Sequence, residues 1–242
     1  MIAGLRVFDT HTHMGRARHS GRMQTMDDML RSMDKSGVDR SLLIPFPAVD
    51  DHAREHNEIA AALCAHPDRF CAAACVHPFA PEFRDEVRRC AVELGFVALK
   101  LQPQFHPLNP LSPRSDFFWE AALDHDLPVI VHTGAGAPLA LPSLYIDVAR
   151  RFPALRIVLA HSGGSSYFLE AIVAAKTCPN IWLELSSLMP HHITEVLAHV
   201  GEDRLMIGSD LPESVETEIG KIVSLARPAI LWDTPVALFR RR

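Results

Sequence analysis

Residues 127–164 read LPVIVHTGAGAPLALPSLYIDVARRFPALRIVLAHSGG, and this stretch holds two short apolar runs separated by a segment with helical spacing. The runs LPVIVHTG and LRIVLAHSGG show little polar alternation, which is typical of strands covered on both faces. SLYIDVARRF lies between them and is long enough for a crossover helix. Strands joined by such a helix pair in parallel, so residues 127–164 predict one β-α-β unit.

The same alternation recurs about eight times along the chain, which predicts a closed (β/α)8 TIM barrel. An open doubly wound sheet is the alternative, but no glycine-rich nucleotide-binding turn follows the first strand. The expected strands lie at 5–9, 40–46, 69–78, 96–103, 127–134, 155–164, 180–187 and 204–210.

Length and composition predict one domain over residues 1–242, since 48% hydrophobic residues can fill one large core. A net charge of -5 gives no basic field for nucleic acid. No apolar run resembles a signal peptide or a membrane span. We therefore expect a cytoplasmic protein that acts on a small-molecule substrate, with no nucleic-acid or membrane partner. The sequence does not decide whether the protein forms a homo-oligomer.

Cysteine usage favours reduced thiols over a disulfide framework, because the chain has an odd number of cysteines in segments that resemble strands or helices. We expect these thiols to be buried. They are Cys64, Cys71, Cys75, Cys90 and Cys178.

Polar side chains gather at the predicted carboxyl ends of the strands, the end at which parallel barrels place their active sites. A single buried histidine is usually a satisfied core residue. Four histidines and an aspartate at one end are hard to explain by packing, because buried polar groups need partners. A shared cation would supply the partner. The polar residues at these strand ends are His11, His13, His77, Lys100, His132, His161, Glu184 and Asp210.

The motif DTHTH carries two of these histidines. Alternate residues of a strand point the same way, so His11 and His13 present two imidazoles to one point. Nitrogen and carboxylate ligands without a thiolate suit zinc, iron or manganese, and the sequence does not choose among them.

The chain resembles the amidohydrolase superfamily, in particular the branch of aminocarboxymuconate semialdehyde decarboxylase and related metal-dependent hydrolases. The resemblance implies that His11, His13, His132 and Asp210 bind the metal. It also implies that His161 lies beside the ion, as a proton-transfer residue and substrate contact or as a ligand to a second ion. The motifs that carry it are FDTHTH, HNEIAAALCAHPDRFCAAACVHP, GFVALKLQP, LPVIVHTGAG, LRIVLAHSGG, NIWLELSS and LMIGSDLP.

Lys100 resembles the superfamily position where a carboxylated lysine bridges two metals, so it is a candidate metal ligand and the site holds one or two ions. A rim lysine that contacts an anionic substrate is the alternative. Related sequences often carry histidine where Gln102 stands. Glu184 either orients a ligand histidine or pairs with a neighbouring strand.

Loop residues are weaker candidates. His77 lines the cavity or belongs to a strand-end turn. The loop after the first strand either grips a substrate carboxylate or is a solvated surface; its charged residues are Arg16, Arg18, His19 and Arg22. Residues 102–115 form a proline-stiffened rim or lid, and His191 and His192 begin a helix near the mouth.

A bound divalent ion would lower the pKa of a water molecule and polarise a carbonyl oxygen. In this scheme Asp210 takes the proton of the water and passes it to the leaving group, and His161 stabilises the developing oxyanion. We expect hydrolysis of an amide, ester or lactone, because the chain is shorter than the decarboxylases of this branch. A metal-dependent decarboxylase and a barrel that binds metal or ligand without turnover are the alternatives.

Overall fold

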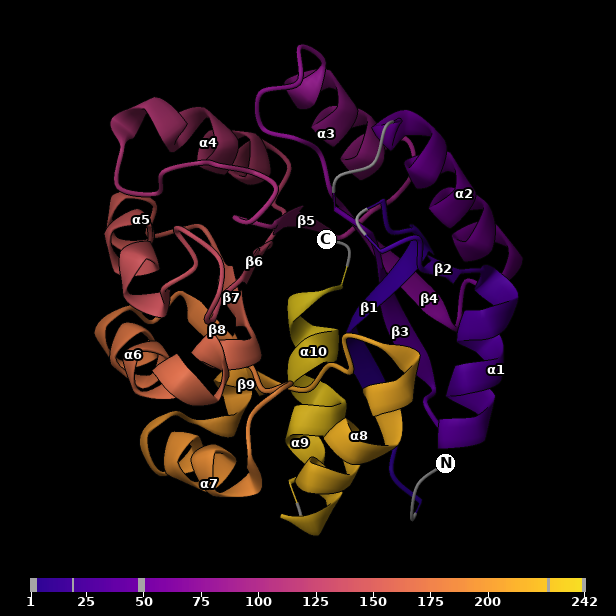
Figure 1. The fold of residues 1–242 in the computed structure, drawn as a ribbon, viewed down its shortest axis with the longest axis vertical. Coiled ribbons are helices and arrows are strands. Elements are labelled where there is room, and N and C mark those ends of the chain that lie inside the picture. The colour runs from indigo at the N-terminus through magenta and orange to yellow at the C-terminus, as the bar shows by residue number, and fades with distance from the viewer. Residues whose placement is uncertain (1–3, 19, 48–50, 226, 241–242) are drawn as a thin grey trace.

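The computed structural model describes residues 4–18, 20–47, 51–225 and 227–240. Within these ranges one nine-stranded sheet has the order β2-β1-β3-β4-β5-β6-β7-β8-β9 (Figure 1). Strand β2 forms an antiparallel hairpin with β1, and the other eight strands pair in parallel. The strands are β1 Phe8–Arg16, β2 Met23–Gln24, β3 Arg40–Pro45, β4 Phe70–Ala74, β5 Ala98–Leu101, β6 Val129–His132, β7 Ile157–Ala160, β8 Ile181–Glu184 and β9 Leu205–Met206.

A helix follows each parallel strand and lies on the outside of the ring of strands (Figure 1). These helices are α1 Met26–Ser36, α2 His52–Ala65, α3 Phe83–Val92, α4 Asp116–Asp124, α5 Tyr145–Arg151, α6 Gly164–Thr177, α7 Pro190–His199 and α8 Val215–Ser224. Two short helices, α9 Pro228–Leu231 and α10 Asp233–Leu238, follow the last βα unit.

Local sequence signals fix the ends of helix α1. The Thr25 side chain accepts the backbone N–H of Asp28, and the Asp28 carboxylate accepts the backbone N–H of Thr25, which forms a capping box. Gly37 follows the helix with φ 69°, a left-handed conformation that favours glycine. The motif TMDD…SG therefore starts and stops the helix without help from the rest of the chain.

Hydrogen bonds between the last and first strands close the barrel. The Thr10 N–H donates to the Ile207 carbonyl over 3.0 Å, and the Asp210 N–H donates to the His11 carbonyl over 2.7 Å. A parallel bridge joins Thr12 to Asp210. An open sheet would leave these groups unpaired, so the prediction of a closed barrel is confirmed.

The barrel interior is an apolar cluster that the C-terminal segment closes from one end. Phe8 lines this interior, and Leu238 and Phe239 at the end of α10 pack into the same cluster. The Trp232 ring lies 6.2 Å from that of Phe8, and the Arg6 guanidinium lies 3.5 Å from the Trp232 ring centroid. The C-terminal segment therefore seals the barrel at the end opposite the βα loops.

Four of the five cysteines are buried free thiols, as expected, but Cys64 is exposed. The expectation of burial was wrong for Cys64 because this residue lies on the solvent side of the amphipathic helix α2. In the described part of the chain no helix is both long enough and apolar enough to cross a bilayer.

Replacing Phe239 with alanine is expected to lower the free energy of unfolding by about 3 to 5 kcal/mol, because a buried aromatic ring would leave a cavity. Phe239 is 2% exposed and packs edge-on against Phe8. Urea denaturation followed by circular dichroism measures the change. Leu169→Ala is the control, since Leu169 is 59% exposed. Equal effects of the two substitutions would show that α10 does not seal the core.

Candidate active site

Strand β1 runs from Phe8 to Arg16, further along the chain than the expected strand over 5–9, and two histidines lie inside it. A register shift between Asp9 and Thr12 bulges the strand, and the rings of His11 and His13 lie 5.3 Å apart. His11 is 1% exposed and His13 is 7% exposed. The His13 ring stacks on Phe46 at 5.0 Å, which holds it at the edge of the site. The predicted convergence of the two imidazoles is what the structure shows.

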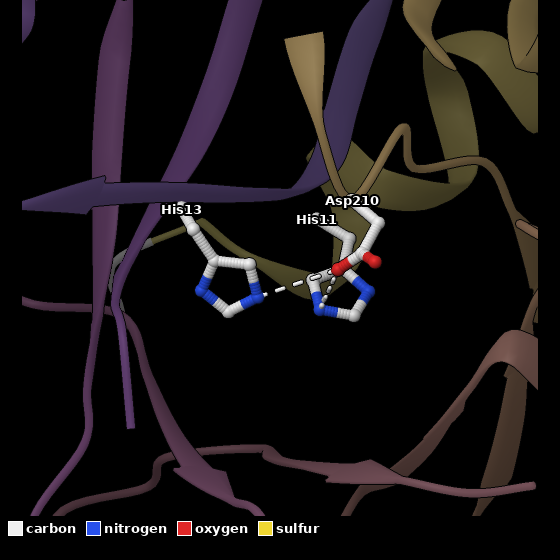
Figure 2. A group of neighbouring side chains, drawn as sticks. All are labelled: His11, His13 and Asp210. Atoms are coloured by element: carbon white, nitrogen blue, oxygen red, sulfur yellow. Dashed lines mark ion pairs between the residues drawn. The ribbon is translucent and has the colours of Figure 1, made fainter. Parts of the chain in front are cut away.

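Asp210, just past β9, faces these histidines (Figure 2). Its Oδ1 lies 3.6 Å from His11 Nε2 and 3.4 Å from His13 Nε2. Burial alone would raise the pKa of this carboxyl, but the hydrogen bond from His13 and the neighbouring histidines hold the pKa well below its usual range. The backbone of Asp210 has φ 63°, a left-handed conformation that aspartate tolerates and that is frequent at functional sites.

The last strand approaches β1 closely because residue 208 is a glycine. A Cβ at Gly208 would lie 2.3 Å from the His11 Cβ and 3.1 Å from Glu184 Oε1. Any larger residue would displace His11 or the strand itself. The close approach of the two strands therefore requires glycine at position 208 of the motif GSD.

His132 and His161 extend the group of imidazoles. The His161 ring lies 4.8 Å from that of His11 and 4.8 Å from that of His132. Burial, followed by the charges of His161 and Lys100, lowers the pKa of His132 to about 2. His132 is therefore neutral and keeps a lone pair for a ligand. His132 joins the cluster through His161 and lies outside the tight group of His11, His13 and Asp210.

Lys100 is buried against the first histidine. Its side chain points into the barrel with 1% exposure, and Nζ lies 3.0 Å from His11 Nε2. Burial lowers the pKa of Lys100 to about 8, and the Asp210 charge opposes that shift. The lysine is thus part of the cluster and not a residue of the solvent-exposed rim.

Glu184, the last residue of β8, connects two of the histidines. Its Oε2 lies 3.1 Å from His11 Nδ1, and the backbone N–H of His161 donates to the same oxygen over 3.0 Å. The carboxylate only accepts, so His11 carries its proton on Nδ1. The lone pair of His11 is therefore on Nε2, which faces Asp210 and Lys100.

Ser186 extends this connection to the His161 side chain. The Ser186 hydroxyl donates to Glu184 Oε2 over 2.8 Å, and Ser186 Oγ lies 2.7 Å from His161 Nδ1. A hydroxyl has one proton, so His161 Nδ1 must donate to Ser186. The Nε2 atom of His161 is then unprotonated. Sequence reasoning missed Ser186, and its spacing of two from Glu184 is the signal that could have found it.

Asp9 is a second buried carboxyl that sequence reasoning missed. Its Oδ1 accepts the backbone N–H groups of His11 and Ser209. Burial raises the pKa of Asp9 to about 7. The aspartate ties β1 to the loop that carries Asp210, and its place two residues before His11 is the available sequence signal.

The charged loop after β1 does not join this cluster in the described residues. Arg16 and Arg18 are exposed, and His19 lies outside the described residues. Arg22 forms an ion pair with Glu213, which lies in the segment after Asp210. At α7 the rings of His191 and His192 are 4.0 Å apart, and His192 stacks on Phe168. None of these contacts involves the histidines of β1.

Fold and site together define a (β/α)8 barrel that gathers imidazoles, carboxylates and a lysine at the mouth of the barrel, the arrangement of metal-dependent hydrolytic enzymes. The chain belongs to the amidohydrolase family, whose model, described as amidohydrolase, matches residues 8–241.

One relative with a named activity is distant in sequence. A 2-keto-4-carboxy-3-hexenedioate hydratase of a Sphingobium species is 26% identical over 178 residues, which cover 57% of this chain and 51% of the relative. The chain thus spans about half the length of that curated relative.

Solved structures share the fold. A 5-carboxyvanillate decarboxylase of Novosphingobium aromaticivorans, complexed with manganese and 4-hydroxy-3-methoxy-5-nitrobenzoic acid, is 17% identical with a TM-score of 0.79, over 98% of this chain and 96% of that one. A probable 2-pyrone-4,6-dicarboxylic acid hydrolase of Acinetobacter baumannii, with citric acid bound, is 18% identical with a TM-score of 0.73, over 97% and 99%.

Proposed function

We propose that the protein is a divalent-metal-dependent hydrolase in which His11, His13, His132 and Asp210 hold the ion. One observation carries the proposal: ligand atoms of His11, His13 and Asp210, from opposite ends of the chain, all lie within 4.8 Å of one another. The family match supports it, since metal dependence is characteristic of amidohydrolases.

The donor set fits a cation. Glu184 fixes the lone pair of His11 on Nε2, toward Asp210. His13 Nδ1 is buried without a hydrogen-bond partner in the described residues, so the contact of His13 with the group runs through Nε2. Two imidazoles and a carboxylate, with His132 beside them, suit zinc, manganese or iron. We propose zinc as the resident ion. Manganese is the alternative, because the structurally similar decarboxylase was solved with manganese.

Lys100 decides whether one or two ions bind. Its Nζ lies 3.0 Å from His11 Nε2. As a free amine it would place a positive charge beside a single ion, and as a carbamate it would add two oxygen ligands. We propose carboxylated Lys100 as an additional ligand, supported by its burial and by the lowered pKa, which favours the unprotonated, nucleophilic amine.

When bound, the ion lowers the pKa of a water molecule and polarises the substrate carbonyl. The neighbouring histidines hold the pKa of Asp210 low, so its side chain is an ionised carboxylate, and we propose that it accepts the proton of the attacking water and returns it to the leaving group. His161 faces the same space with an unprotonated Nε2, because Ser186 and Glu184 hold its proton on Nδ1. We therefore propose His161 as a second proton acceptor, since a donor to an oxyanion would need the opposite tautomer.

We propose a small carboxylated substrate. A divalent ion at the mouth would attract an anionic group of the substrate. The three relatives described above are named for polycarboxylates or an aromatic carboxylate. We also propose a single domain over residues 1–242 and a cytoplasmic location, which the free cysteines support.

A hydratase is the second candidate, favoured by the curated relative, which is named a 2-keto-4-carboxy-3-hexenedioate hydratase. Hydration and hydrolysis both need a positioned water and a proton acceptor, so the residues proposed above serve either reaction.

Turnover assays on zinc-loaded protein test the proposal. We expect ring opening of 2-pyrone-4,6-dicarboxylate or of a carboxylated chromogenic lactone. Water addition to 2-keto-4-carboxy-3-hexenedioate would assign the hydratase, and carbon dioxide release from 5-carboxyvanillate would assign a decarboxylase. If the protein has full metal content but turns over none of these substrates, the proposal is wrong and the protein is a barrel that binds metal or ligand without catalysis.

Gly208→Ala is expected to lower kcat/KM about a hundredfold, because the added methyl group would displace His11 and a shift of about 1 Å in a catalytic group costs this much. Metal analysis should show weaker zinc retention at the same time. Gly220→Ala is the control: nothing lies within 4 Å of a Cβ at that helical position. Unchanged activity and zinc affinity in Gly208→Ala would show that residue 208 does not lie as close to His11 as described.

A further inference from the structure

A second group of histidines lies at the mouth of the barrel, next to the candidate metal centre. Inner-face residues Cys71, Ala73 and Cys75 of the β4 segment line the barrel interior. The same alternation, extended by two residues, predicts that His77 lies at the mouth. Ala73 pairs with Ala98, so the same register two residues further on places Cys75 beside Lys100. His77 is then one layer above the lysine.

His106 completes this second group from the loop after β5. Its ring centroid lies 5.5 Å from that of His77, in an edge-on arrangement. The side chain is 1% exposed, although it belongs to a proline-rich loop. The charges of His77, His52 and Lys100 all contribute to lowering the pKa of His106, so these groups lie near one another. The loop over 102–115 therefore places a buried imidazole beside His77.

Backbone contacts fix the proton of each ring. The Phe79 N–H donates to His77 Nδ1 over 3.2 Å, and the Gln102 N–H donates to His106 Nδ1 over 3.3 Å. An imidazolium has no lone pair to accept such a bond, so both rings are neutral and carry their proton on Nε2. Burial, which lowers the pKa of His106 to about 3, agrees with this.

Both rings therefore offer an Nε2–H donor. Neither donor has a hydrogen-bond partner within the described ranges of the chain. Arg22, one of the charged residues considered for binding a substrate carboxylate, forms an ion pair with Glu213. A substrate carboxylate has two oxygen atoms that accept such bonds, and hydrogen bonds to a charged group are stronger than neutral ones.

We propose that His77 and His106 form a carboxylate-binding subsite, which receives a second carboxylate of the substrate while another group of the same molecule reaches the metal centre. This inference rests on the proposed function. It assigns to the enzyme a substrate class, small dicarboxylic or tricarboxylic acids, and it gives the loop over 102–115 a role in specificity.

The test compares two substitutions that share a structural cost. His106→Phe and His106→Gln both lose the Nδ1 acceptor of the Gln102 N–H, but glutamine keeps an N–H near the position of Nε2. Calorimetry on zinc-loaded protein would measure binding of benzoate against isophthalate, and of butyrate against glutarate. Each pair differs by one carboxylate.

In the unsubstituted protein at least one diacid should bind about tenfold or more tightly than its monoacid, as expected for hydrogen bonds to a charged group. His106→Gln should keep most of this ratio, and His106→Phe should reduce it to about one, with unchanged zinc content. If His106→Phe fails to fold, as judged by thermal unfolding, the same comparison is made with His77→Phe and His77→Gln.

Two results would overturn the subsite: equal binding of monoacids and diacids by the unsubstituted protein, or a diacid preference that survives in the folded phenylalanine variants. Failure of the proposed function looks different. In that case the protein would retain no zinc or would turn over no substrate, whatever the ratio of diacid to monoacid binding.

Discussion

Asp210→Asn is expected to lower kcat/KM by about a thousandfold or more, because one change removes a ligand charge and the proton acceptor for the attacking water. The side chain is nearly isosteric, so the fold should persist. Asp210 Oδ1 lies within 3.6 Å of both β1 histidines. Steady-state kinetics on zinc-saturated protein measure the effect on chemistry separately from the effect on metal affinity.

Asp124→Asn is the matched control, since Asp124 is 63% exposed on α4. It should leave kcat/KM within about twofold, as surface substitutions usually do. An Asp210→Asn variant that keeps more than a tenth of the activity would remove Asp210 from the mechanism.

His11→Ala is expected to abolish both zinc retention and activity. His11 contacts Glu184, Lys100 and Asp210, so its loss removes a ligand and leaves the Glu184 carboxylate without one of its donors. A buried acceptor that loses its partner costs about 1 to 3 kcal/mol, so the barrel should still fold, with a lower melting temperature. Elemental analysis and circular dichroism measure the two effects.

His199→Ala serves as the control for His11→Ala, because His199 is 40% exposed on α7 and forms an ion pair with Glu195 within the same helix. We expect it to keep full zinc content and activity. A His11→Ala protein with normal zinc stoichiometry and turnover would show that β1 does not hold the ion.

The strand and helix order could be predicted because each unit carries its own local signal. The run LPVIVHTG at 127–134 predicts a strand, which the structure shows as β6 at 129–132, and DFFWEAALDHD predicts α4, without knowledge of the rest of the chain. The bulge in β1 and the hairpin strand β2 could not be predicted, because both depend on how β1 pairs with β3 and with the chain that follows.

The position of the candidate site could be predicted from the sequence, but its hydrogen-bond network could not. His11, His13 and Asp210 could be assigned to one mouth because they fall at strand ends. The hydrogen bonds between Glu184 and His11 and between Ser186 and His161 join segments that are far apart in sequence. Such contacts set the tautomers, and no periodicity in a single sequence encodes them.

Burial was the hardest property to predict. The loop over 102–115 is rich in proline, which indicates irregular chain, yet His106 in that loop is 1% exposed. The charged residues of the loop after β1 suggested a binding site for a substrate carboxylate. In the structure, however, Arg22 forms an ion pair with Glu213 in the segment after Asp210. Which of two polar loops turns inward depends on packing between distant segments.

The central claim is that side chains from β1 and from the segment after β9 share one cation. Anomalous scattering at the zinc edge, from crystals of zinc-loaded protein, tests it most directly. We predict a peak about 2.0 to 2.2 Å from His11 Nε2, His13 Nε2 and an Asp210 oxygen. A fully loaded crystal with its peak elsewhere, and with these three side chains in contact only with one another, would contradict the account.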